Sequence, residues 1–200
     1  MTPRRGAIRE RILRVLLNEP EGRLTKYRLS KKADASFPWT HEFLGKLEAD
    51  GYVKDMKVLD FEGLIRYWIK VRRKPGNREY LIQRPLQLLR DTDLNYTLTT
   101  YQAENLVQGY LFPSRIDLYV KGKEKGDWHR LLSSEGLVGR GNVRILFDDD
   151  HVFYGAQETK GLWTVSNPQL LVDLFMEGGV CIEAAELLLG KVGGKAVQRI

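Results

Sequence analysis

The sequence predicts an α+β protein of two domains, the first a helix-turn-helix followed by a wing. Residues 24–51 pass from a short helical segment through a turn to a second helical segment that ends on glycine. Two segments with strand character, 52–59 and 64–72, follow around a turn at 60–63. Beyond residue 78, helical and strand segments alternate, which is typical of α+β domains.

The 200 residues are enough for two small domains that each bury a core. We expect a winged helix domain at 1–74 and an α+β domain with a mixed sheet at 79–200. A short, polar stretch at 75–78, rich in residues that break regular structure, is expected to link them.

Positive charge is concentrated near the N-terminus. The whole chain carries a net charge of +6, but residues 1–78 hold 19 Lys/Arg against 10 Asp/Glu, a net charge of +9. Residues 79–200 hold 13 against 16, a net charge of −3. A cationic helix-turn-helix region is typical of nucleic-acid binding. The alternative, a hyperthermophile-style surface rich in charges of both signs, would not confine the surplus to one end.

The sequence predicts a cytoplasmic protein without a membrane partner. No apolar run reaches the length of a bilayer-spanning helix, and the basic N-terminus leads into an amphipathic helix instead of an apolar signal core. The single cysteine, Cys181, excludes an internal disulfide, fits a reducing compartment, and is interpreted as a core residue.

The apolar spacing predicts three helices in the first domain. The first is expected at Arg4–Asn18 and the second at Lys26–Lys32, with Thr25 as its N-cap and Tyr27 and Leu29 as core contacts. The third is expected to begin around residues 36–38, where serine and proline are typical, and to end at Gly51.

The third helix is the predicted recognition helix. A helical wheel places one group of side chains inward, namely Phe37, Thr40, Phe43, Leu44 and Leu47. The outward N-terminal half is expected to contact base edges through Trp39, His41, Glu42 and Lys46. Packing of Trp39 on Phe43, one turn away, is an alternative to base contact.

Alternation along 64–72 predicts that Arg66, Lys70 and Arg72 share one face of a wing strand and contact the phosphate backbone. Asp60 and Glu62 in the turn favour contact through the flank of the wing and not through its tip. The complete set of predicted DNA contacts is Lys26, Arg28, Lys31, Lys32, Trp39, Thr40, His41, Glu42, Lys46, Arg66, Lys70 and Arg72.

In the second domain, strands are expected at 96–98, 114–120 and 162–165, with a hairpin of 143–147 and 151–154 across three aspartates. Helices are expected at 85–90, 100–107, 128–132, 170–176 and 182–189, the last two separated by a glycine pair.

Three stretches carry a resemblance to a known family: TLTTYQAENLV at 97–107, SRIDLYV at 114–120, and VSNPQLLVDLFMEGG with EAAELL from 165 to 188. They resemble the C-terminal domain of the AbiEi family, antitoxins and transcriptional regulators of type IV toxin–antitoxin systems. The resemblance covers roughly the last half of the chain. It implies a nucleotidyltransferase-like C-terminal domain behind a winged helix, and a repressor of its own operon; direct contact with a toxin is not implied.

The leading hypothesis is therefore a sequence-specific regulator of double-stranded DNA, with no catalytic residue, metal or cofactor. A homodimer would fit palindromic half-sites. The main alternative is a nucleotidyltransferase-like, nucleotide-binding enzyme that docks on nucleic acid through the winged helix. For that chemistry Asp117 is the nearest first carboxylate, but Tyr119 occupies the place of a second. A third hypothesis is a protein-docking module.

Overall fold

The computed structural model describes residues 6–197 and shows an α+β protein with a mixed sheet. The chain divides into two units. The first unit comprises the described residues up to Arg73, the segment Asn167–Met176, and the described residues from Ala185 onward; the second comprises Lys74–Ser166 and Glu177–Ala184. No helix within residues 6–197 combines the length and the apolar character needed to cross a membrane.

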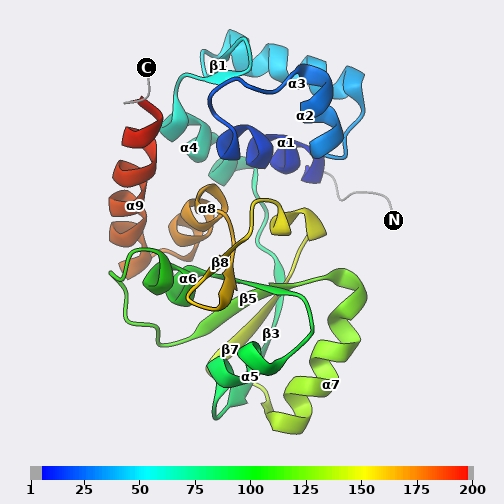
Figure 1. Ribbon diagram of the computed structural model, residues 1–200, viewed down its shortest axis with the longest axis vertical. Helices are drawn as coiled ribbons and strands as arrows, with labels where there is room; N and C mark the ends of the chain where they lie inside the picture. The colour runs from blue at the N-terminus through cyan, green and yellow to red at the C-terminus, as the bar shows by residue number, and fades with distance from the viewer. Residues whose placement is uncertain (1–5, 198–200) are drawn as a thin grey trace. The chain divides into compact units, whose positions relative to one another are not determined.

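The first unit is built from helices and one small hairpin (Figure 1). Its elements are α1 (Ala7–Asn18), α2 (Lys26–Lys32), α3 (Phe37–Ala49), β1 (Val53–Lys54), β2 (Lys57–Val58) and α4 (Phe61–Val71), joined by most of α8 (Asn167–Glu177) and the later part of α9 (Val180–Val197). The expected first helix is confirmed from Ala7 onward, while Arg4 and Arg5 lie outside the described residues.

The two helices at the centre of the prediction are confirmed. Helix α2 has the predicted bounds, and the Thr25 hydroxyl accepts a hydrogen bond from the Arg28 backbone N–H at 3.2 Å. Helix α3 begins after Ser36, although the Ser36 side chain makes no capping hydrogen bond. Gly51 follows α3 with a φ of +79°, the left-handed conformation that favours glycine after a helix.

The predicted second wing strand is wrong, because residues 61–71 form the helix α4. The Asp60 carboxylate accepts a hydrogen bond from the Gly63 backbone N–H at 2.8 Å and so caps this helix. A Cβ at residue 63 would collide with that carboxylate. The buried face of α4 follows helical spacing and comprises Phe61, Leu64, Ile65 and Trp68.

The hairpin lies entirely within the first predicted strand. Strands β1 and β2 pair in antiparallel register, with Val53 opposite Val58 and Lys54 opposite Lys57. Asp55 and Met56 connect them with φ values of +47° and +71°. Positive φ at both central residues is the geometry of a type I′ turn, whose twist suits a two-residue hairpin.

A buried polar network joins α1, α4 and α8 in the first unit. The Arg72 guanidinium, whose side chain is fully buried, lies 2.7 Å from the Glu10 carboxylate and 3.1 Å from that of Asp173. Arg14 donates a hydrogen bond to Gln169 at 2.9 Å and lies over the indole of Trp68. Buried charges require such partners, so Asp173 has a structural role in this unit.

The second unit contains a seven-stranded mixed sheet with the strand order β6-β3-β7-β5-β4-β9-β8. Two neighbouring pairs are parallel, β5 with β7 and β4 with β9, and the others are antiparallel. The strands are β3 (Gly76–Ile82), β4 (Tyr96–Thr99), β5 (Ile116–Val120), β6 (Gly136–Val138), β7 (Val143–Phe147), β8 (Gln157–Thr159) and β9 (Leu162–Thr164).

The helices of the second unit fall mostly where they are expected. They are α5 (Pro85–Asp91), α6 (Thr100–Val107) and α7 (Lys125–Glu135), with the short 3₁₀ helices η1 (Gly122–Glu124) and η2 (Asp150–Phe153). The glycine pair between α8 and α9 is also confirmed, and both glycines have positive φ.

Two predictions for this unit are wrong. The linker expected at 75–78 is wrong from Gly76 onward, because Gly76–Ile82 forms the strand β3, paired with β7 from Gly76 to Tyr80. The segment after β7 is η2 and not the second strand of a hairpin. Here Asp149 accepts a hydrogen bond from the His151 backbone, and Asp150 accepts one from Gly122, both at 2.8 Å.

The units also differ from a linear division of the chain. The boundary after Arg73 lies within one residue of the expected end of the first domain, but Asn167–Met176 and the later part of α9 belong to the first unit.

Candidate nucleic-acid interface

An exposed strip of aromatic and cationic side chains crosses α2 and the start of α3. Its members are Lys31, Tyr27, Phe37 and His41, which we call the aromatic strip. The Lys31 ammonium lies 5.4 Å from the centre of the Tyr27 ring, which lies 6.4 Å from the Phe37 ring. The His41 ring stacks on Phe37 at 6.1 Å.

Exposure of the aromatic strip corrects two sequence predictions. Tyr27 and Phe37 are expected in the core, yet they are 59% and 45% exposed. The buried apolar side chain of α2 is Leu29, whereas Phe43, Leu44 and Leu47 fill the inward face of α3. Large aromatic rings that stay in water need either a partner or a ligand to account for them, and nucleic-acid bases are one such ligand.

The outward face of α3 carries an exposed ion pair. The Lys46 ammonium lies 2.8 Å from the Glu42 carboxylate one turn earlier. This hydrogen bond and the positive charge of Lys46 hold the pKa of Glu42 below its usual value. A pair this exposed opens at little cost. Lys46 can therefore exchange Glu42 for a phosphate.

Two other predicted contacts on α3 are less accessible. Thr40 is buried, and its hydroxyl donates a hydrogen bond to the Ser36 carbonyl at 2.9 Å, so its prediction as a DNA contact is wrong. Trp39 is half-buried and packs against Phe43 with ring centres 5.3 Å apart. This contact confirms the packing alternative for Trp39.

The predicted cations of α2 differ in whether a carboxylate pairs with them. Lys26 lies 3.5 Å from Glu48, and Lys32 lies 2.7 Å from Glu19, so both are engaged by carboxylates. Arg28 and Lys31 are exposed, and neither forms an ion pair with another residue between 6 and 197. They are the cations of α2 best placed to meet a phosphate.

The hairpin adds two lysines that the sequence analysis does not select. Lys54 is exposed and Lys57 half-buried, and their cross-strand pairing puts them side by side at the tip. The signal for them is the mirror-symmetric stretch Val-Lys-Asp-Met-Lys-Val at 53–58, which a two-residue turn closes on itself.

The predicted cationic face of the wing does not exist, because Arg66 and Lys70 lie on α4 and Arg72 directly follows it. Arg72 is buried between carboxylates and cannot reach a phosphate. Arg66 lies 2.7 Å from Glu62 and 3.3 Å from Glu186. The hydrogen bond that Arg66 donates to Glu62 is the main reason why the pKa of Arg66 is raised. Lys70 is exposed on the same helix.

The carboxylate named for the enzyme alternative, Asp117, is buried in an ion-pair cluster of the second unit. Its oxygens accept hydrogen bonds from Arg115 at 2.7 Å and Arg144 at 2.9 Å, and from the Thr100 hydroxyl. Both guanidinium groups also bind Glu177. A divalent cation at Asp117 would have to displace two guanidinium groups that neutralise it.

Thr100 starts α6 with a φ of +46°, an outlier for a β-branched residue. This conformation aims its hydroxyl at Asp117 and fixes the cluster to the helix.

Beside the cluster, burial raises the pKa of the Cys181 thiol to about 11. The thiol is therefore protonated at neutral pH, in agreement with its interpretation as a core residue.

Among the predicted contacts and the two hairpin lysines, the cations accessible to a phosphate thus lie on α2, α3 and the hairpin, together with Lys70 on α4. Ammonium and guanidinium groups can bind phosphates, while rings and polar side chains at the start of α3 can contact bases. Across residues 6–197, no group of three or more His, Cys, Asp or Glu side chains could hold a metal ion. No protein-family model, curated protein or solved structure matches this chain.

Proposed function

We propose that this protein is a sequence-specific regulator that binds double-stranded DNA through its first unit. In this proposal the first unit is a winged helix. Helix α3 enters the major groove, and the hairpin β1–β2 is the wing that lies on the phosphate backbone. The observation that carries the proposal is the exposed aromatic strip continuous with the cations of α2 and α3.

Charge supports the same assignment. The net charge of +9 over residues 1–78 attracts a polyanion, while the second half of the chain repels it. Arg28, Lys31, Lys46, Lys54 and Lys57 supply the phosphate contacts in this proposal, and His41 with Phe37 supplies contacts to bases.

The resemblance to the AbiEi family supports a more specific role, an antitoxin-type repressor of its own operon in the cytoplasm. The proposal gives no catalytic role to Asp117. An enzyme that transfers nucleotides would need that carboxylate accessible to a metal-bound triphosphate, and two guanidinium groups hold it instead.

The test is a titration of fluorescent duplexes, read by anisotropy. One duplex comes from the DNA upstream of the protein's own coding region, and a second has the same length and composition in scrambled order. Five phosphate contacts predict that affinity falls roughly five-hundredfold between about 50 and 200 mM salt. Tighter binding to the upstream duplex supports a regulator. Equal affinity for both duplexes would reduce the protein to a nonspecific binder, and no binding at low salt would end the proposal.

A further inference from the structure

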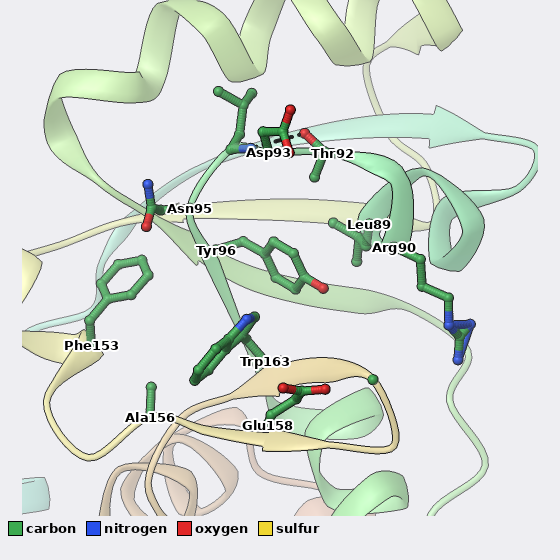
Figure 2. A pocket seen from close by; sticks show the side chains of 12 residues that line it. Leu89, Arg90, Thr92, Asp93, Asn95, Tyr96, Phe153, Ala156, Glu158 and Trp163 are labelled. Atoms are coloured by element: carbon green, nitrogen blue, oxygen red, sulfur yellow. Dashed lines mark hydrogen bonds between the residues drawn. The ribbon is translucent and has the colours of Figure 1, made fainter.

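The second unit contains a pocket of about 450 Å³ between the hairpin β8–β9 and the segment that joins α5 to β4. Figure 2 shows Tyr96 in the middle of this pocket, Trp163 and Glu158 on the hairpin, and Arg90 and Phe153 toward opposite ends. This volume is within the range of small-molecule sites and is large enough for a nucleoside.

The floor of the pocket offers a flat ring beside a carboxylate. Trp163 on β9 is opposite Glu158 on β8 in the register of the hairpin, so both side chains stand on the same face. Trp163 is 47% exposed, whereas its strand neighbours Leu162 and Thr164 are buried. A tryptophan held at the surface by a buried strand presents its ring to whatever enters the pocket.

The opposite wall is rigid. Tyr96 is only 6% exposed. Burial raises the pKa of Tyr96, while the charges of Arg90 and Glu158 act on it in opposite directions. Strands β4 and β9 are also paired through Leu98 and Thr164, so the hairpin is fixed to the sheet and the pocket is already formed.

The charged groups around the pocket are available to a ligand. Arg90, Asp93 and Glu158 are exposed, and none of them forms an ion pair or side-chain hydrogen bond with another residue of the described chain. A carboxylate only accepts hydrogen bonds, and a guanidinium only donates them. A ligand that satisfies both groups has adjacent N–H donors that face the Glu158 carboxylate. It also has an anionic or acceptor group that faces the Arg90 guanidinium.

We propose that this pocket binds a guanine base, as a nucleoside or nucleotide. The base stacks on Trp163 and donates its ring N–H and its amino group to the two oxygens of Glu158. Arg90 is placed to bind a phosphate of the same nucleotide. Adenine presents a ring acceptor where guanine presents the ring N–H, so it would set a lone pair against the carboxylate and bind more weakly.

Isothermal titration of the full chain with guanosine 5′-monophosphate tests the proposal, with adenosine 5′-monophosphate as the competitor base. We expect saturable binding at one site per chain and a preference for guanine. Trp163→Leu should weaken binding roughly tenfold or more through lost stacking. The control Leu137→Ala, which removes another exposed apolar side chain from the same sheet, should leave the affinity unchanged.

The variant Glu158→Gln gives the sharpest test, because an amide presents one acceptor and one donor. Guanine affinity should fall roughly tenfold, and the preference should shift toward adenine, whose edge matches an amide. The control Glu135→Gln, an exposed carboxylate at the end of α7, should bind as wild type. Retained guanine preference in Glu158→Gln would overturn the assignment. It would also be overturned if neither guanosine nor its monophosphate showed saturable binding and no oligonucleotide bound.

The guanine can come from a free nucleotide or from a single strand. A parallel titration with short single-stranded oligonucleotides that contain one guanine, or adenine in its place, separates these sources. Guanine-dependent binding of the oligonucleotide alone, lost in Glu158→Gln, keeps the site and assigns it to a strand. The proposed duplex binding lies in the first unit and this pocket in the second, so failure of the proposed function would leave the mononucleotide titrations unaffected.

Discussion

The Arg72 guanidinium lies 3.1 Å from the Asp173 carboxylate, so the end of α4 is tied to a helix that begins nearly a hundred residues later. Glu10 on α1 completes the arrangement at 2.7 Å. This contact makes an N-terminal basic region and a C-terminal helix parts of one folded unit. It also buries Arg72, which the sequence predicts as a DNA contact, so this cation is absent from the proposed DNA-binding surface.

Arg72→Ala should therefore destabilise the protein severely. Its loss leaves the buried Asp173 and the half-buried Glu10 without their guanidinium, which costs about 3–5 kcal/mol of unfolding free energy. Urea unfolding followed by circular dichroism measures the change. The neighbouring exposed Arg73→Ala should stay within about 0.5 kcal/mol of wild type. Equal stabilities of the two variants would show that the buried network contributes little.

Asp60→Ala tests the helix that replaces the predicted wing strand. Because Asp60 caps α4 through the Gly63 N–H, the variant should lose about 0.5–2 kcal/mol of unfolding free energy. A wing strand with residues 60–63 as its turn would tolerate this change. The exposed Asp50→Ala, at the end of α3, is the matched control and should have little effect.

The ion-pair cluster of the second unit predicts a pH dependence. Burial opposes the charge of Glu177, but its hydrogen bonds to Arg144 and Arg115 prevail and lower its pKa. A carboxyl group with a lowered folded pKa stabilises the protein above its unfolded value, about 4.3, and loses this contribution as the pH falls through the folded value. Unfolding free energies between pH 7 and pH 3 measure it.

Glu177→Gln should be less stable than wild type at pH 7, and the difference should shrink toward pH 3. Glu135→Gln provides the comparison, since Glu135 is exposed at the end of α7. A difference between Glu177→Gln and wild type that does not change with pH would contradict the role given to the charge of Glu177.

The sequence predicts local helices well in this protein. Helix α2 has a capping threonine and Leu29 as its apolar anchor, and α3 has an inward apolar stripe with a terminal glycine. These signals lie within the helices they define. They are sufficient to place both helices, but not to place Tyr27 and Phe37, whose exposure depends on how α2 and α3 pack together.

The failures share a physical cause. Residues 64–72 satisfy alternation and helical spacing at once, and the capping contact between Asp60 and Gly63 decides for the helix. Strand β3 begins with polar residues, and its partners β6 and β7 come more than fifty residues later. The pairing of Asp173 with Arg72 is equally distant, so no local pattern reveals it.

The hairpin lysines give a direct prediction for DNA binding. Lys54→Ala/Lys57→Ala should weaken binding to all duplexes alike and reduce the slope of log affinity against log salt by about 2, since each phosphate contact contributes about 0.9. Lys123→Ala/Lys125→Ala removes the same charge from the second unit and should leave the slope unchanged. A slope reduced equally by both pairs would indicate a general charge effect.

Lysine footprinting by mass spectrometry tests the proposed interface most directly. The protein is treated with an amine-reactive reagent alone and with saturating duplex, and the reactivity of each lysine is compared. We expect Lys31, Lys46, Lys54 and Lys57 to lose reactivity on DNA, while Lys123 and Lys160 in the second unit react as before. Unchanged reactivity on α2, α3 and the hairpin, with protection confined to the second unit, would contradict the assignment of DNA binding to the first unit.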